Sequence, residues 1–480
     1  MQYKYPQRPI LLFCLVLLAI GCAPVSPSLI NPALKKEPLK EIFAITNVNV
    51  IPMTPGGRIL PNATVVIEDG KISSINRPVP KHAKLIDGRG KWLIPGLIDM
   101  HVHNLADINF GPVYPTKGAN AFTDTQDLML LYVTNGVTTA FELSGRPEHF
   151  AERNEIIKGD VIGPRLALAI LIDGGEGSDN RANTPEDGRQ TVRIAKAQGY
   201  EFIKVYSSLS MDTFKAIVDE AQKQGMKVVG HIPNAFKGRL EEAFVPNYSM
   251  VAHAEEYAKQ TENFSDEDAT RFAGLAKKNG TWLTPTLTTM VRIGEQARSL
   301  DAIRNLPTLK YVAPLMQSKW LTSNNYNTGT SPERVASIDK TAEFNVRLVK
   351  AFKEADVPIV TGTDAGVSGV VWGFSLHDEM ELLVKAGLST QEVLASATRL
   401  PATWLGIQDK IGTIEEGKFG DLILLEANPL DNISNARKIS GVFVNGRWIT
   451  RKKIDTMLSD LENRNTEAKN RVDWNKRKRY

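Results

Sequence analysis

The sequence predicts an α/β protein, with an eight-stranded parallel barrel and a small β-sandwich domain built from both chain ends. Across residues 93–409, short apolar runs rich in β-branched residues alternate with segments of helical periodicity. This alternation is typical of βα units in a parallel sheet. On both sides of this region lie β-rich runs that contain hairpin turn signals. We therefore expect a (β/α)8 TIM barrel over residues 93–409 with a composite β-sandwich beside it.

Eight apolar runs are the predicted barrel strands. They cover residues 93–103, 137–142, 165–171, 202–206, 227–231, 250–253, 282–287 and 357–363. Helical periodicity over residues 211–224 and 335–354 predicts two of the intervening helices. Residues 288–330 are longer than a βα connection needs, and we expect a lid or pocket wall there.

The composite domain is predicted from residues 41–92 and 410–450. In the first segment, two β-rich runs meet at Asp69-Gly70, and in the second a run turns at Asn445-Gly446. Both dipeptides favour type I′ hairpins. Residues 451–480 form a charged tail with a basic end. A solvated helix with a frayed terminus is the simpler interpretation, and contact with an anionic surface is the alternative.

Residues 1–22 have the pattern of a bacterial lipoprotein signal peptide. Lys4 and Arg8 precede an apolar segment that ends at Gly21-Cys22, where cleavage would leave a cysteine for lipid attachment. An uncleaved anchor helix is the alternative, but it leaves the Gly21-Cys22 ending unexplained. Residues 23–40 then read as a tether. Ala23 follows the cysteine, and by resemblance to bacterial sorting rules we expect a lipid-anchored protein of the cell envelope, on the outer membrane facing the periplasm.

The remaining composition is that of an ordinary globular protein, with 42% hydrophobic residues, 23% charged residues and a formal charge of +4. Nothing in it indicates a nucleic-acid partner, and it leaves homo-oligomerisation open. The two cysteines are Cys14, inside the signal peptide, and Cys22, the lipidation site. A metal in the mature chain would therefore be bound by histidine, carboxylate or modified lysine.

Candidate metal ligands occur at the ends of five predicted strands. His101 and His103 are spaced i, i+2, which places both imidazoles on one face of a strand. The others are Lys204, His231, His253 and Asp364. In parallel barrels the active site forms at the carboxyl ends of the strands. Each residue alone has a structural explanation, such as a core histidine or a helix-capping aspartate, but their shared position favours one site.

The order His-x-His, Lys, His, His, Asp resembles the binuclear members of the amidohydrolase superfamily, in particular the prolidase-like and imidazolonepropionase-related branch. The matching motifs are Gly136-Val137-Thr138-Thr139, Gly163-Pro164-Arg165, Phe202-Ile203-Lys204-Val205-Tyr206, Thr284-Pro285-Thr286-Leu287 and Thr363-Asp364-Ala365-Gly366. The resemblance implies two divalent metal ions, most commonly zinc, with Lys204 carboxylated as a bridging ligand. Desolvation would favour the neutral amine that carboxylation needs.

The resemblance also implies hydrolysis by a metal-bridging hydroxide. Asp364 would move its proton. Tyr206 lies two residues past Lys204 on the same strand face, where it would donate to the developing oxyanion or, alternatively, only fill the barrel rim. Glu142 and His377 are candidate substrate contacts. Two stretches depart from the pattern of the resembling family: Ala140-Phe141-Glu142, which follows the Thr-Thr pair of the second strand, and the glycine-rich residues 174–177 after the third strand.

The expected reaction is cleavage of an amide or peptide bond in a small molecule, such as a dipeptide or an N-acyl amino acid. Hydrolysis of a cyclic amide, lactone or phosphoester by the same site is the enzymatic alternative. A surface lipoprotein that only binds a ligand is the alternative from another class. A pure binder would need neither the bridging lysine nor the acid–base aspartate.

Overall fold

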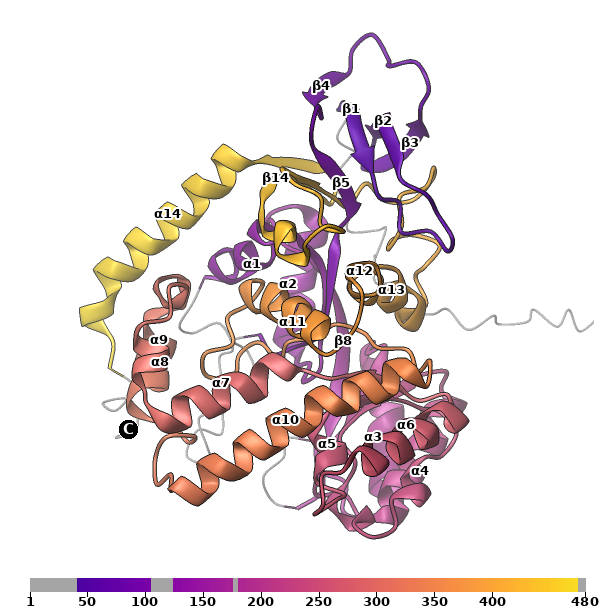
Figure 1. The fold of residues 1–480 in the computed structure, drawn as a ribbon, viewed down its shortest axis with the longest axis vertical. Coiled ribbons are helices and arrows are strands. Elements are labelled where there is room, and N and C mark those ends of the chain that lie inside the picture. Colours follow the sequence, from indigo (N-terminus) through magenta and orange to yellow (C-terminus); the bar gives the residue numbers. More distant parts are fainter. Residues whose placement is uncertain (1–40, 105–123, 176–179, 474–480) are drawn as a thin grey trace, which may run out of the picture.

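A computed structural model describes residues 41–104, 124–175 and 180–473. Cys22, the predicted signal peptide and tether, and the last residues of the basic tail lie outside this part of the chain. Figure 1 shows a β-sheet region, which carries β1 to β5, next to a larger region in which helices surround the barrel strands.

The barrel consists of seven parallel strands that pair in sequence order. They are β6 Leu97–Val102, β7 Val137–Glu142, β8 Arg165–Ile172, β9 Phe202–Val205, β10 Lys227–Gly230, β11 Tyr248–Ala252 and β12 Trp282–Thr284. This parallel order confirms the predicted α/β barrel architecture.

The predicted eighth strand, 357–363, closes the barrel through single bridges instead of a continuous ladder. Leu283 bridges Ile359 on one side, and Val102 bridges Ala365 on the other. Pro358 cannot donate to a ladder. At Gly362 a Cβ would approach the Thr284 hydroxyl oxygen to 2.4 Å. The Thr361 amide donates to the Ser396 carbonyl at 2.8 Å instead of to a neighbouring strand, and this interrupts the pairing along the segment.

The predicted first strand, 93–103, is wrong as a single element. It divides into β5 Trp92–Pro95, which belongs to the composite sheet, and β6, which belongs to the barrel. Gly96 lies at the junction, where a Cβ would approach the Thr138 hydroxyl oxygen to 2.0 Å. Glycine at this junction leaves room for the Thr138 side chain where the chain passes from one sheet to the other.

The composite sheet joins both chain ends in one eight-stranded sheet. Antiparallel pairing of β5 with β13, in which Leu93 is opposite Leu424, connects the amino-terminal and carboxyl-terminal segments. Buried aliphatic and aromatic side chains from both segments share its core. The other strands are β1 Ile42–Val50, β2 Leu60–Glu68, β3 Lys71–Ile75, β4 Lys84–Asp87, β13 Leu422–Leu425, β14 Ile439–Val444 and β15 Arg447–Thr450.

Helices cover the outside of the barrel (Figure 1). They are α1 Thr125–Thr134, α2 Pro147–Lys158, α3 Pro185–Gln198, α4 Met211–Lys223, α5 Glu255–Ala258, α6 Asp266–Asn279, α7 Leu287–Arg298, α8 Asp301–Arg304, α9 Pro314–Thr322, α10 Pro332–Glu354, α11 Phe374–Lys385, α12 Thr390–Ser396, α13 Arg399–Leu405 and α14 Arg451–Ala468. Local sequence sets their ends. In α3, Thr184 and Asp187 form a capping box, and Gly199 ends the helix in the left-handed conformation.

The long connection 288–330 folds mainly into α7, α8 and α9. The Glu379 carboxylate on α11 fixes the start of α7, because it accepts hydrogen bonds from the backbone amides of Leu287 (2.9 Å) and Thr288 (2.7 Å). Free amides at a helix start need such an acceptor. This long-range cap holds α7 directly after β12, at the carboxyl end of the barrel.

The tail helix α14 packs onto the barrel domain more closely than a solvated helix would. Ile454 and Leu461 are buried, Arg464 forms an ion pair with Asp127, and the Asn465 amide donates to the Lys310 carbonyl at 2.9 Å. Among the described residues, no helix combines the length and apolar character needed to cross a membrane.

Candidate active site

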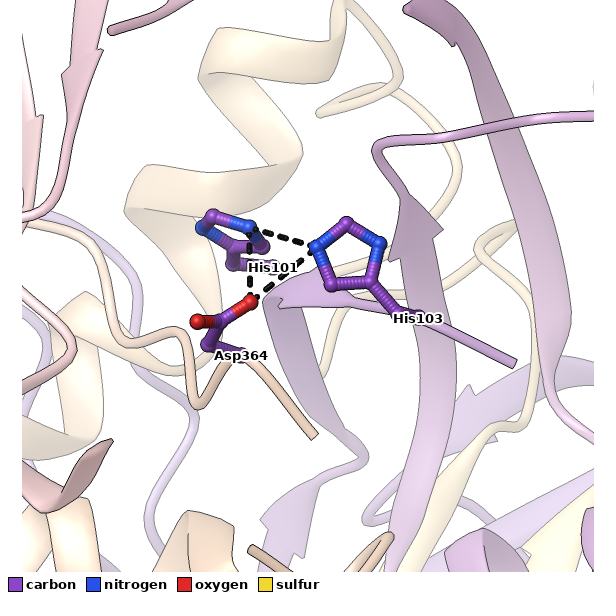
Figure 2. A group of neighbouring side chains, drawn as sticks. All are labelled: His101, His103 and Asp364. Carbon is purple, nitrogen blue, oxygen red and sulfur yellow. Dashed lines mark hydrogen bonds and ion pairs between the residues drawn. The ribbon is translucent and has the colours of Figure 1, made fainter. Parts of the chain in front are cut away.

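His101, His103 and Asp364 bring three ligand atoms together at the barrel mouth (Figure 2). The Asp364 Oδ1 lies 3.2 Å from the His101 Nε2 and 3.0 Å from the His103 Nε2. The two Nε2 atoms are 3.2 Å apart. Two imidazole nitrogens and a carboxylate oxygen that converge in this way form a typical site for a divalent transition metal.

The backbone holds two of the strand-end residues in an unusual conformation. The φ angles of Asp364 and His253 are +60° and +76°, in the left-handed region that residues other than glycine rarely adopt. Such a residue costs about 1–3 kcal/mol and persists when its surroundings fix it. For Asp364, the backbone amide donates to the His101 carbonyl at 2.7 Å. This hydrogen bond between the closing segment and the first barrel strand therefore places Asp364 next to His101 and His103.

His253 and His231 lie next to the group formed by His101, His103 and Asp364 and extend the cluster. The ring centroid of His253 lies 4.5 Å from that of His101 and 4.9 Å from that of His231. The His253 Nδ1 is 2.8 Å from the Thr286 hydroxyl. The structure therefore places all four predicted histidine ligands in one contiguous cluster.

Glu256 fixes the proton position on His231. Its Oε1 lies 3.1 Å from the His231 Nδ1, and the Ser207 hydroxyl lies 2.8 Å from the same nitrogen. An ionised carboxylate only accepts hydrogen bonds, so Nδ1 carries the proton and Nε2 keeps its lone pair. The buried Nε2 has no hydrogen-bond partner in the described structure. An orphaned acceptor in this position fits a metal ligand.

The electrostatics of the site favour metal binding. Burial lowers the pKa values of His101, His231 and His253 well below the usual value, so all three imidazoles are neutral, as ligands must be. Burial alone would raise the pKa of Asp364, but the hydrogen bond from His103 lowers it well below its usual range. The carboxylate is therefore ionised.

Lys204 lies in β9 with its side chain fully buried. Burial lowers its pKa to about 8, against the opposing charge of Asp364. Phe202 and Val229 precede Lys204 and His231 by two residues on adjacent strands, and Trp404 stacks on Phe202 with ring centroids 5.2 Å apart. An apolar layer thus closes the barrel beneath the site and disfavours the charged ammonium form.

Tyr206 follows β9 and covers His231. The centroids of the two rings are 4.0 Å apart, and 37% of the Tyr206 surface is exposed. Burial of the rest raises the pKa of the phenol, which keeps the hydroxyl protonated at neutral pH. The residue is therefore placed as a hydrogen-bond donor at the rim of the site.

Glu142 is fully buried beside His103, which favours an orienting role over the predicted substrate contact. Its Oε1 is 3.5 Å from the His103 Nδ1 and accepts from the Ser144 amide at 2.8 Å. Its Oε2 accepts from the Asn104 amide at 2.7 Å. These contacts leave the carboxylate directed at the ligand His103.

His377 lies on α11, in the helical layer. Its Nε2 is 3.0 Å from the Asn135 carbonyl oxygen at the end of α1, and 2% of its surface is exposed. Burial lowers its pKa to about 4. The structure does not bring His377 into the histidine cluster, because α11 directs it toward α1.

Two supporting carboxylates were not predicted. Asp99 accepts hydrogen bonds from the Thr363 hydroxyl at 2.7 Å and the His101 amide at 3.2 Å, and so ties the first strand to the closing segment. Its i−2 spacing from His101 is a signal that could have revealed it. Glu256 acts on His231 from a separate element, and no sequence spacing connects them.

Replacing Glu256 tests its effect on His231. We expect Glu256→Ala to weaken metal binding about 10- to 100-fold, as loss of a carboxylate partner to a ligating histidine does. Glu256→Gln should restore part of this affinity, because its amide oxygen can accept from Nδ1. Metal titration should give the lowest affinity for Glu256→Ala, an intermediate affinity for Glu256→Gln and the highest affinity for the wild type. Glu255→Gln is the matched control, and equal weakening in all three variants would contradict the orienting role.

Comparison with known proteins identifies the class. Residues 92–449 match the Amidohydrolase family, and the chain belongs to this family. Imidazolonepropionase from Thermoplasma acidophilum is 24% identical over 382 residues, which are 78% of this chain and 85% of the relative.

Solved structures agree with the family assignment. A Bifidobacterium longum protein described as a candidate prolidase has a TM-score of 0.67 and 25% identity, over 88% of this chain and 100% of that chain. A Xaa-Pro dipeptidase with bound methionine shares the fold, with a TM-score of 0.65 and 22% identity over 85% of this chain and 100% of that chain. The protein is a metal-dependent amidohydrolase, and its family supports hydrolysis of carbon–nitrogen bonds.

Proposed function

We propose that the protein is a binuclear amidohydrolase that cleaves the amide or peptide bond of small substrates such as dipeptides and N-acyl amino acids. The observation that carries the proposal is the convergence of four histidines and Asp364 with the buried Lys204 at the barrel mouth. His101, His103 and Asp364 would hold one metal ion, and His231 and His253 the other, with carboxylated Lys204 between them.

Two divalent ions at such a site, most commonly zinc, supply an activated water at neutral pH and polarise the substrate carbonyl. The chain's own residues do the rest. The Asp364 Oδ1 faces the two histidines, which leaves Oδ2 to accept the proton of the attacking water and return it to the leaving nitrogen. The Tyr206 hydroxyl donates to the carbonyl oxygen as negative charge develops there.

Metal-loaded protein without residues 1–40 tests the reaction class. We expect hydrolysis of N-acyl amino acids or dipeptides in a panel that also contains cyclic amides, lactones and phosphoesters. Turnover confined to lactones or phosphoesters would contradict the proposed bond class. A protein that binds metal but hydrolyses no member of the panel would support the non-catalytic alternative.

We further propose that lipid at Cys22 anchors the enzyme in the bacterial cell envelope, on the outer membrane facing the periplasm. Cys22→Ser should release the protein into the soluble fraction, because a lipid chain cannot be attached without the thiol. Fractionation with immunoblotting measures this. Cys14→Ser is the matched control and should leave the distribution unchanged. Membrane retention of the Cys22→Ser protein with normal processing would contradict the anchor.

A further inference from the structure

A pocket of about 540 Å³ lies beside the metal site. Three of its lining residues follow successive barrel strands: Asn234 after β10, Glu255 after β11 and Met290 on the helix after β12. Asn234 is three residues beyond His231, and Glu255 is two residues beyond His253. The pocket therefore opens at the carboxyl end of the barrel, next to the second histidine pair.

Helix α10 forms the outer wall of this pocket. Ser337, Ile338 and Thr341 contribute from one stretch of the helix. Helices α10 and α7 lie side by side (Figure 1), and a Cβ at Gly294 of α7 would be 3.4 Å from the Ile338 side chain. The wall is thus a packed helix, so the pocket is largely preformed.

A chain of contacts connects the pocket to the metal site. The Lys259 ammonium lines the pocket and lies 2.6 Å from the Glu256 Oε1. The same oxygen is 3.1 Å from the His231 Nδ1. The pocket therefore borders the residues that support His231, and the charges of its wall residue Glu255 and of Asp364 are close enough to interact.

Four of the twelve residues that line the pocket, Ala258, Phe264, Met290 and Ile338, supply apolar surface for a carbon-rich group. The other eight are polar or charged, and Lys237, Gln260 and Thr261 are among them. The charge of the Lys259 ammonium is neutralised locally, because the group contacts the Glu255 carboxylate at 3.1 Å as well as that of Glu256. The volume lies within the range of about 300–1,000 Å³ typical of small-molecule sites, which are mostly apolar with a few polar groups.

We propose that this pocket binds a large apolar group of the substrate, an alkyl chain or aromatic ring on one side of the scissile amide. This inference rests on the proposed function and gives it a substrate class: amides that carry a bulky apolar acyl group or amino-acid side chain. Short, polar amides would leave the pocket unfilled, and the apolar burial that favours binding would be lost.

Filling the pocket from α10 tests the inference. The variants are Ser337→Trp and Thr341→Trp, and the matched control is Ala336→Trp, an exposed position on the same helix that does not line the pocket. N-decanoylglycine and N-acetylphenylalanine present the apolar group on opposite sides of the amide, and N-acetylglycine lacks it. We expect kcat/KM to fall at least about tenfold on one or both large substrates, with little change on N-acetylglycine. The substrate that is affected identifies the source of the group.

Equal losses on all three substrates, or no loss, would overturn the inference. Binding separates it from the proposed function, because it needs no turnover. In calorimetry with metal-loaded protein, decanoate should bind more tightly than acetate. Ser337→Trp should reduce this ratio of affinities at least about tenfold, and Ala336→Trp should leave it unchanged. If no amide is hydrolysed, the proposed function fails, but the decanoate measurement still shows whether the pocket binds an apolar chain. Equal binding of decanoate and acetate would overturn it.

Discussion

An Asp364→Asn variant should keep most of its metal and lose turnover. The four histidines and Lys204 remain as ligands, so metal content should stay close to that of the wild type. The amide of asparagine keeps the shape of the side chain but cannot accept the proton of the attacking water. We expect kcat to fall by roughly 10²–10⁴, the usual contribution of a positioned acid–base group. Steady-state kinetics on protein of measured metal content checks both parts.

The outcome separates two roles of Asp364. Loss of metal together with activity would show that the residue acts mainly as a ligand. A metal-replete variant with near wild-type turnover would show that another group moves the proton, and Glu142 would be tested next. Asp99→Asn is a useful comparison, because Asp99 contacts the Thr363 hydroxyl and the His101 amide and acts only through positioning.

Replacing either histidine of the second pair should remove metal and activity together. His231→Ala and His253→Ala each delete one ligand of the proposed second ion, and four-coordinate sites tolerate this poorly. We expect each variant to retain about one ion per chain and to lose at least about 10³-fold in kcat/KM. A single ion cannot both activate the water and polarise the substrate carbonyl as the pair does. Elemental analysis and kinetics on the same preparation measure the two effects.

Two histidines outside the cluster, His82 and His377, are controls for these variants. His82 is exposed in the loop before β4, and His82→Ala should change neither metal content nor rate. His377→Gln keeps a donor toward the Asn135 carbonyl, which the wild-type side chain contacts from α11, and should also keep its metal. Full metal retention in His231→Ala or His253→Ala would contradict the assignment of that residue as a ligand.

Much of the barrel could be predicted because its signals are local. Parallel strands buried on both faces appear as continuous apolar runs, and this located the seven strands that form ladders. The exceptions depend on close approaches between segments distant in sequence. Gly96 divides the first run because it packs on Thr138. The eighth run pairs only through bridges, because Pro358 has no amide to donate and the Thr361 amide donates to Ser396, a contact that only the assembled barrel shows.

The clustering of the candidate ligands was predictable for a topological reason, whereas the residues that support them were not. Strand ends meet at one face of a barrel, so His231 and His253 could be placed together without coordinates. Glu256 and Glu379 act across elements: one orients His231 and the other caps α7. Such contacts depend on how helices pack against strands, which residue spacing does not encode. The same limit applies to Glu142, which faces His103, and to His377, which α11 directs toward α1.

The metal content of active protein tests the central claim most directly. Protein purified without chelators, and shown to be active on an amide substrate, should contain two divalent ions per chain by elemental analysis. Activity should disappear on chelation and return in proportion to the second ion added. A fully active protein with a single ion per chain would contradict the binuclear site, and full activity without any divalent ion would contradict the whole account.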